Sequence, residues 1–455
     1  MHSAKLTMTK LLSVLFVVCG LQSAVYAQEN SPYSRYGLGD LAPNHNISSR
    51  GMGGISAGLF DYQSNYSGFG SLNFVNPASL GSLPLTIFDI GAEVDIRTLK
   101  SINPVKKFTV ANSIFSYLQL GFPLTTAKMR KKGNSWGMSF GMKPVTKINY
   151  KIGTYTKTAL DSMYTLYEGS GGANQAFVGT GLKFKNLSIG VTAGYMFGNK
   201  DYSSKRELIN DTVTYAKGNI EEKTNFGGIV VTGGLQYDIV LNKDKTKLFP
   251  RLRLGVYGNL QQKLNAKRDK IDETFSRDAN GATYRIDSVY QETDVKGTIE
   301  YPSSFGGGFT YQDDHWLFGA DYEMTNWSKY RYYGQTDQVQ NNWTIRVGGQ
   351  YYPAKVNTPV KKYFNFVKYR AGFYYGPDYI KTNNSRPDYA VTLGTGMPLT
   401  SLQRLSYYNT EYVVLNTALE IGGRGDKNAN IRETTIRFSI GVSMNASWFI
   451  KRKYN

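Results

Sequence analysis

The chain has 455 residues, of which 53 are Lys or Arg and 34 are Asp or Glu, and its mean hydropathy is −0.38. One cysteine, Cys19, and three histidines are too few for a disulfide framework or for a metal site built from Cys and His, although a carboxylate metal site stays open. The net charge of +19 would fit a nucleic-acid partner, but the N-terminal residues predict export. Anionic lipid head groups, an acidic partner or well-solvated turns account for the charge better.

The first 27 residues have the pattern of a secretory signal peptide. Lys5 and Lys10 precede or flank a short apolar run, LLSVLFVV, and Ala-Val-Tyr-Ala at residues 24–27 offers the small residues that a signal peptidase reads. The apolar run is too short to span a bilayer. We therefore expect residues 1–27 to be removed after Ala27. A lipid anchor on Cys19 would require a small residue where Val18 stands.

Residues 28–85 form a region of their own, which is rich in Gly, Ser and Asn and lacks sustained alternation. Disordered tails are poor in aromatic and apolar residues, whereas this region has many, so we expect a folded insert ahead of the first strand. It opens on the stretch NSPYSRYGLGD at residues 30–40. The residues that we expect to shape this stretch are Pro32, Tyr33, Arg35, Tyr36 and Gly37.

Arg35 is the residue of this stretch for which we predict a specific contact. Its planar guanidinium suits a carboxylate, and the flanking tyrosines can stack on that plane. Glu93 and Asp95 are the acids that we expect it to reach, because both lie on the polar face of the first predicted strand. The alternative is an arginine that faces solvent.

From residue 86 onward, apolar side chains recur at every second position. The clearest runs are Phe88–Ile96, Trp136–Met142, Leu187–Phe197 and Ile436–Ile450, and the residues between their apolar positions are mostly small, polar or charged. The last run is about 15 residues long, which exceeds the usual strand of a soluble sheet. Long strands that are apolar on one face only are typical of a transmembrane β-barrel with a polar interior.

The connections between these runs alternate in length. Short turns are predicted at Lys185-Asn186, 242–246 and 312–315, and longer polar loops near 151–172, 199–224, 262–302 and 328–341. In outer-membrane barrels the short turns face the periplasm and the long loops face outward. The predicted fold class is therefore all-β: a transmembrane antiparallel barrel of about 14 strands over residues 86–455, with residues 28–85 as an N-terminal plug in its lumen.

Three similar triplets, which begin at Asp161, Asp211 and Asp287, lie in the longer polar segments. They fit either a repeated transition from loop to strand or sites for O-linked sugar. Enzymatic chemistry has little support, because a Ser-His-Asp arrangement needs a histidine base and both His45 and His315 lie in turn-like runs. We expect no catalytic residue, no metal, no cofactor and no nucleic-acid partner.

Two motifs in the N-terminal region resemble a known family. Arg50-Gly51-Met52-Gly53-Gly54, followed by Asn76-Pro77-Ala78, is similar to the opening of the FadL-type outer-membrane barrels. The stretch NSPYSRYGLGD is similar to the start of a Bacteroidetes branch of that superfamily, and GSGGANQAFVGTG, DYEMTNW and WFIKRKY resemble later parts of it. The resemblance implies a fourteen-stranded barrel in the outer membrane of a Gram-negative bacterium, with the N-terminal segment folded into the lumen as a hatch.

For function, the resemblance implies passage of a hydrophobic small molecule, which in characterised transporters leaves the barrel sideways into the membrane. The hatch would include Arg50, Gly51, Gly53, Gly54, Asn76 and Pro77. Asn76-Pro77 is either a hatch turn that shapes the ligand path or a connector into the first strand. No ligand-binding residue is identified by motif.

Some relatives, such as the PorV component of type 9 secretion, act as barrel subunits of protein-export machinery. The alternative function is therefore a non-transporting subunit of an export or insertion complex. The expected partners are outer-membrane lipid together with a hydrophobic ligand or other subunits of such a complex.

Overall fold

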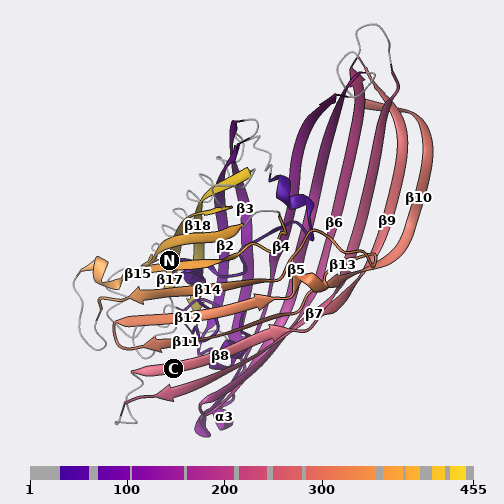
Figure 1. Cartoon of the computed structure of the whole chain (residues 1–455). Coiled ribbons are helices and arrows are strands. Elements are labelled where there is room, and N and C mark those ends of the chain that lie inside the picture. The colour runs from indigo at the N-terminus through magenta and orange to yellow at the C-terminus, as the bar shows by residue number, and fades with distance from the viewer. Residues whose placement is uncertain are drawn as a thin grey trace, which may run out of the picture.

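The computed structural model describes residues 31–60, 70–102, 105–157, 161–209, 215–242, 250–278, 283–354, 362–382, 386–399, 412–425 and 431–446. The predicted signal peptide, Cys19 and the triplet at Asp211 lie outside these residues. Within them, one antiparallel sheet closes on itself as a barrel (Figure 1). No helix among the described residues is long and apolar enough to cross a membrane.

The barrel wall has fourteen strands. Two of them are interrupted, so that β8 and β9 are successive parts of one strand and β10 and β11 are successive parts of the next. The elements of the wall are β2 (Thr86–Ser101), β3 (Lys106–Pro123), β4 (Asn134–Lys157), β5 (Ser162–Phe184), β6 (Leu187–Ile209), β7 (Lys217–Val240), β8 (Arg251–Asn259), β9 (Gln262–Arg277), β10 (Thr283–Tyr301), β11 (Ser304–Gln312), β12 (Trp316–Thr325), β14 (Asn342–Tyr351), β15 (Lys368–Pro377), β16 (Pro387–Pro398), β17 (Tyr412–Arg424) and β18 (Ile431–Ala446). Pairing of β18 with β2, from Ile431↔Ser101 to Ala446↔Thr86, closes the ring and confirms the predicted count.

The alternation along each strand separates an apolar outer face from a polar inner face. In β2, Ile90, Val94 and Ile96 are 37–39% exposed on the outside, whereas Glu93 and Asp95 are at most 5% exposed. Exposed apolar side chains around a closed wall fit a barrel whose outer face meets hydrocarbon. Closure also pairs the backbone groups that an open sheet would leave unbonded in lipid.

The two ends of the barrel differ. We call the turn end the end at which β2 begins and β18 ends; it includes the two-residue turn at Lys185-Asn186 and the short helix α3 (Ala127–Lys131). The opposite end is the far end. The predicted short turns at 185–186 and 312–315 lie at the turn end, while most of 242–246 lies outside the described residues.

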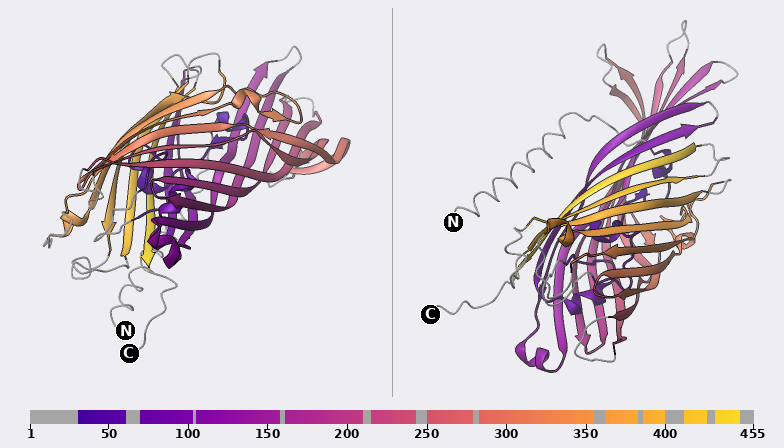
Figure 2. Two further views of the ribbon diagram at one scale, coloured as in Figure 1. Left: turned by 90° about the horizontal axis from the view of Figure 1, so that it is seen from below. Right: turned by 90° about the vertical axis from the view of Figure 1, so that its left-hand side faces the viewer.

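Three of the four predicted long loops are strands instead. Residues 151–172, 199–224 and 262–302 belong largely to β4, β5, β6, β7, β9 and β10, and only 328–341 is mainly loop, with the short strand β13 (Arg331–Tyr332) in it. We call the far-end parts of these six strands the blade. Figures 1 and 2 show them rising together beyond the rest of the wall. Most side chains of these strand parts are polar, with scattered apolar ones, and that composition led to the prediction of loops.

The blade bends away from the rest of the wall where the sequence interrupts regular pairing. Pro144 in β4 has no N–H to donate, and a register shift follows it between Pro144 and Thr146. On β5, Gly171 and Gly172 have φ values of +122° and +133°, which residues with a side chain rarely adopt. The glycine-rich stretch 169–181 therefore bends the sheet at this level.

The wall is divided between β3 and β4. These strands pair only from Leu118↔Met142 to Pro123↔Gly137, although β3 begins at Lys106 and β4 continues to Lys157. Beyond Met142 they diverge, because β3 stays with β2 and β4 stays with β5 in the blade. Part of the opening is filled by the N-terminal segment, whose strand β1 (Asp40–Leu41) pairs with β4.

The N-terminal segment, residues 31–60 and 70–85, contains the 3-10 helices η2 (Pro32–Arg35) and η3 (Pro77–Ser82), the helical turn α2 (Ile47–Arg50) and β1. Most of its described residues are buried. It approaches the inner face of every one of the fourteen wall strands. Its contacts with all sides of the ring place it across the barrel interior.

Candidate functional site: the barrel interior

A ring of inward-facing glycines lets the N-terminal segment approach the wall. A Cβ added at any of twelve strand glycines would lie 3.0 Å or closer to an atom of the segment, a distance that real Cβ atoms essentially never show. These are Gly91, Gly121, Gly137, Gly181, Gly190, Gly234, Gly255, Gly319, Gly348, Gly372, Gly394 and Gly441, from twelve different strands. The other two strands contact the segment through Thr310 on β11 and Glu420 on β17. The wall is thus shaped to receive the segment's backbone.

The Asn76-Pro77 motif lies at the centre of this packing. The Asn76 side chain accepts a hydrogen bond from the N–H of Ala78 (3.1 Å), and its Nδ2 donates to the carbonyl of Ala57 (2.7 Å). Pro77 is the first residue of η3, where its missing N–H costs nothing. The motif therefore joins the two halves of the segment, beyond leading into β2.

The Arg50-Gly51-Met52-Gly53-Gly54 motif forms the turn after α2. Gly53 and Gly54 have φ values of +70° and +85°, and both lie too close to neighbouring atoms to tolerate a large side chain. Gly51 packs against Gly394 on β16, and the N–H of Gly53 donates to Thr392 Oγ1 (2.8 Å). The glycines place the Arg50 side chain against β2 and β17.

Arg50 is bound by two carboxylates from different strands. Its Nε lies 2.6 Å from Glu420 Oε1 on β17, and its Nη1 contacts Glu93 Oε2 on β2. Arg437 on β18 also contacts both carboxylates. Arg50 and Glu93 are 3% and 5% exposed, so these charges are paired out of contact with bulk water.

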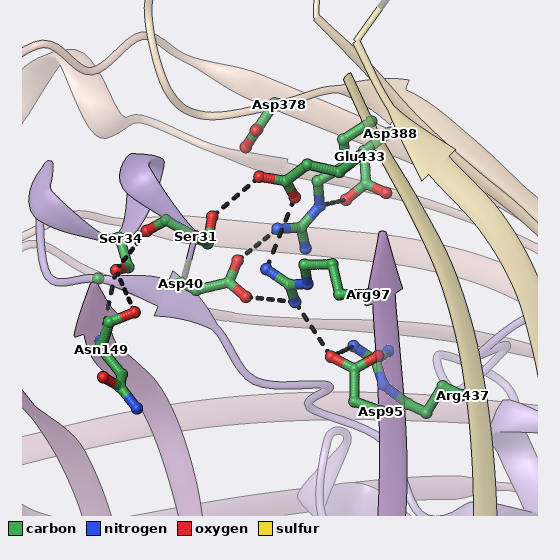
Figure 3. A network of polar contacts seen from close by, with 12 residues as sticks. Ser31, Ser34, Asp40, Asp95, Arg97, Asn149, Asp378, Asp388, Glu433 and Arg437 are labelled. Atoms are coloured by element: carbon green, nitrogen blue, oxygen red, sulfur yellow. Dashed lines mark hydrogen bonds and ion pairs between the residues drawn. The ribbon is translucent and has the colours of Figure 1, made fainter. Parts of the chain in front are cut away.

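The ion pairs continue into one network near the start of the segment (Figure 3). Asp40 binds Arg97 (2.7 Å) and Arg424, and Ser31 Oγ donates to Glu433 (2.9 Å). The connected set comprises Arg50, Arg97, Arg386, Arg424 and Arg437 with Asp40, Glu93, Asp95, Asp378, Asp388, Glu420 and Glu433. It attaches the segment to β2, β16, β17 and β18.

The partner predicted for Arg35 is wrong. Arg35 is exposed, and its guanidinium lies over the ring of Tyr167 (5.2 Å) rather than near Glu93 or Asp95. Arg50 binds Glu93, and Arg97 binds Asp95 (3.1 Å). The short helix η2 turns the Arg35 side chain toward β5, a direction that spacing along the sequence does not reveal.

The other predicted residues of the opening stretch contact the wall by different means. Tyr33 stacks on Arg386 (3.5 Å) instead of Arg35, and the carbonyl of Tyr36 accepts from Tyr379 (3.2 Å). Gly37, with φ of +59°, donates its N–H to Asp337 (2.8 Å), and its carbonyl accepts from Lys200 Nζ (2.8 Å). Pro32 begins η2.

A cavity of about 270 Å³ lies between the segment and the wall, and its lining is about half polar or charged and half apolar or aromatic. Lys143 is the notable residue that the sequence did not single out. It is 8% exposed and makes no ion pair with any described residue; its ammonium contacts Asn44 Oδ1 and the ring of Phe74 (4.6 Å). Arg346, also on the lining, binds Glu323 (2.8 Å). An inward lysine at an every-second position was visible in the sequence, but its burial was not.

His315 lies in a turn and His45 is buried beside the cavity. His315 Nδ1 contacts the carbonyl of Tyr352 (2.8 Å), and its N–H donates to Asp313 in the turn before β12. His45 is buried at the cavity, and its Nε2 has no hydrogen-bond partner among the described residues. No group of three or more His, Cys, Asp or Glu that could hold a metal is present within the part of the chain that the structure describes.

Of the two described Asp triplets, Asp161 directly precedes β5, whereas Asp287 lies within β10. The loop-to-strand interpretation therefore fits the first and not the second.

Comparisons with known proteins give the chain a family and relate its fold to solved structures. The family model described as BamG matches residues 8–455. The structure of a Pseudomonas aeruginosa FadL homologue is 14% identical, with 90% of this chain and 99% of that chain covered and a TM-score of 0.55. The P. putida toluene transporter TodX (14% identity, 90% and 100% covered, TM-score 0.56) and the Ralstonia pickettii toluene transporter TbuX (14%, 89% and 99%, TM-score 0.51) have the same fold. A search of curated proteins finds no match.

Proposed function

The chain belongs to the BamG family, and from that premise we propose that it is a non-transporting barrel subunit of an outer-membrane complex that exports or inserts proteins. The observation that carries the proposal is the closure of the barrel by its own N-terminal segment. The segment reaches all fourteen strands and is attached by buried ion pairs. A barrel filled in this way serves better as a fixed body in the membrane than as an open path.

The cavity supports the same proposal. About half of its lining is polar, and this half includes Lys143, Arg346 and Glu323, so a hydrophobic molecule there would have to displace water from charged groups without replacing their hydrogen bonds. Pockets for hydrophobic ligands are mostly lined by apolar and aromatic side chains. The hatch, in this proposal, is a permanent plug.

The blade offers a surface for other subunits. It carries apolar side chains far from the lipid-facing band, among them Tyr155 (74% exposed), Ile286 (60%) and Val289 (73%). On the side away from β9, the edge strand β10 pairs with a described strand only at Ile299 and Glu300, which face the two residues of β13. Three register shifts along β10 make this edge irregular, so we expect partners to bind the faces of the blade rather than to extend its sheet.

Purification from the native outer membrane in mild detergent tests the proposal. We expect stoichiometric protein partners to remain bound to the wild-type barrel. A variant with shortened blade hairpins, from which residues 152–167, 207–217 and 271–291 are replaced by two-residue Asn-Gly turns, should lose them. The cuts follow the register, since Lys151 pairs with Glu168, Arg206 with Gly218 and Lys270 with Glu292.

The matched control shortens a far-end hairpin outside the blade. Replacement of residues 99–108 by the same two-residue Asn-Gly turn connects Thr98 to Thr109, which are already paired, and should keep the partners. A wild-type barrel that purifies alone would contradict the proposal, as would a blade-shortened variant that folds and keeps every partner.

Transport of a hydrophobic small molecule is the second candidate, and the divergence of β3 from β4 favours it. An opening in the wall would let such a molecule leave sideways. The test is transfer of the dye Nile red into vesicles that contain the purified barrel, compared with vesicles that contain a heat-inactivated sample. Accelerated transfer, together with purification as a lone barrel carrying lipid, would favour transport over the subunit role.

A further inference from the structure

The connection between β3 and β4 forms a basic projection at the turn end. Helix α3 lies within it, with the Thr126 hydroxyl accepting from the N–H of Met129 (3.3 Å). Four cations follow within five residues: Lys128, Arg130, Lys131 and Lys132. All four are exposed, and none forms an ion pair with a described residue. Figure 1 shows α3 at the lower extremity of the molecule.

The surroundings do not neutralise this charge. The sequence has no Asp or Glu between Asp95 and Asp161, so β3, α3 and β4 are entirely without acidic residues. The adjacent turn adds another exposed cation, Lys185, beside the start of β4, because Asn134 pairs with Phe184. The projection therefore presents a positive field that no acidic residue of β3, α3 or β4 offsets.

The projection begins where the apolar outer face ends. Phe184 and Leu187, which are paired across the turn, are 47% and 39% exposed, and Leu182 and Ile189 continue the apolar face away from the end. Basic side chains directly beyond a lipid-facing band lie at the depth of head-group phosphates. An acidic protein would not require this alignment with the apolar face.

We propose that the projection of Lys128, Arg130, Lys131 and Lys132 binds the phosphates of anionic phospholipids at the surface of the membrane. The turn end faces the periplasm in barrels with short turns at that end, so the lipids are those of the phospholipid leaflet. The site fixes the depth and tilt of the barrel on the β3–β4 side. It acts whether or not the barrel has partner subunits.

The distribution of charge between the two ends supports this assignment. The described residues between strands at the turn end (124–133, 185–186, 241–242, 250, 313–315, 352–354, 362–367 and 399) include 6 Lys or Arg and 2 Asp or Glu. The described residues between strands at the far end (102, 105, 161, 215–216, 278, 326–341, 378–382, 386 and 425) include 4 Lys or Arg and 4 Asp or Glu. Among the described connections, the excess of positive charge therefore lies at the turn end.

Native mass spectrometry of the purified full chain tests the proposal. The protein is equilibrated with equal amounts of dioleoyl phosphatidylglycerol and dioleoyl phosphatidylcholine in detergent, and the retained lipids are counted. We expect the wild type to prefer phosphatidylglycerol. Each cation near an anionic surface changes binding by about fivefold. In the variant K128Q/R130Q/K131Q/K132Q, the ratio of bound phosphatidylglycerol to bound phosphatidylcholine should therefore fall at least about fivefold.

The matched control removes four exposed cations from the far ends of β2, β3 and β4, K100Q/K106Q/K107Q/K157Q. It has the same net charge as the test variant and should keep the wild-type preference. Equal losses in both variants, or no preference in the wild type, would overturn the proposal. So would a test variant that keeps its lipid preference and instead loses an acidic protein partner in membrane pull-downs. None of these outcomes depends on the blade experiment, so the two proposals can fail separately.

Discussion

At the scale of single residues, the buried arginines hold the N-terminal segment to the wall. Removing one partner of a buried ion pair is far more costly than removing an exposed ion, because the remaining charge is left without compensation. Arg50 has two carboxylate partners and is 3% exposed, whereas Arg35 is exposed and its guanidinium lies over the Tyr167 ring without an ion pair to any described residue. The two arginines therefore form a natural pair for comparison.

We expect Arg50→Ala to lower the free energy of unfolding by about 3–5 kcal/mol, since Glu93 and Glu420 would each lose a buried partner. Urea-induced unfolding in lipid vesicles, followed by tryptophan fluorescence, measures the change. Arg35→Ala should shift stability by no more than about 0.5 kcal/mol. Equal effects of the two substitutions would show that the network does not anchor the segment.

Sequence reasoning found the residue types of this network but not their pairing. Glu93 and Asp95 were identified from their alternation on β2, and both are indeed inward-facing. The choice between Arg35 and Arg50 depends on how η2 and α2 orient their side chains inside the barrel. Partners that lie hundreds of residues apart, such as Arg50 and Glu420, leave no local pattern.

At the scale of elements, the alternation of apolar and polar side chains predicted the strands of the wall well. Every such strand needs an apolar side toward lipid and a polar side toward the interior. Nothing imposes such a pattern on the blade, where both faces meet polar surroundings. The sequence of these strands therefore predicts loops. Their strand structure is evident only from the pairing in the structure, for example from Lys151↔Glu168 to Lys157↔Ser162. The residues of the bend were present in the sequence, but Gly171-Gly172 were noted only as part of a resemblance and Pro144 was not singled out.

The glycine ring gives a prediction for single elements. Gly348 on β14 faces the Met52 carbonyl, so Gly348→Ala should push the segment from the wall and cost about 1–3 kcal/mol, as overpacking does. Gly233 on β7 has open space where a Cβ would lie. Gly233→Ala should be neutral or slightly stabilising, since alanine reduces the freedom of the unfolded chain. The comparison is between the urea concentrations at which half of each variant is unfolded in vesicles. A Gly348→Ala barrel as stable as the wild type would contradict the close packing of Gly348 against Met52.

At the scale of the whole molecule, the strand count and the closure of the barrel followed from the sequence, while its division into wall and blade did not. The composition of the cavity was also inaccessible, because the inward residues of one strand acquire meaning only beside those of its neighbours. Lys143 and Arg346, which are about 200 residues apart, line the same space.

The closed interior gives a prediction for the intact barrel. Wild-type protein in a planar bilayer should show no stable conductance steps, because the segment crosses the interior at the level of the glycine ring. The Arg50→Ala variant should show intermittent openings, since its segment is held less firmly. Steady porin-like conductance of the wild type would contradict the proposed plug, whereas silence of both proteins would place the anchoring elsewhere in the network.

The network also has a consequence for the order of folding. Ser31 and Glu433, which are hydrogen-bonded, are 402 residues apart, and Arg50 and Glu420 are 370 apart. Ser31 and Arg50 are synthesised long before Glu433 and Glu420. Their side chains can therefore be paired only after those later strands have been made. High contact order slows folding. During that interval an unpaired, aromatic-rich segment would have to be kept from aggregation, and its docking would be completed only when β18 meets β2.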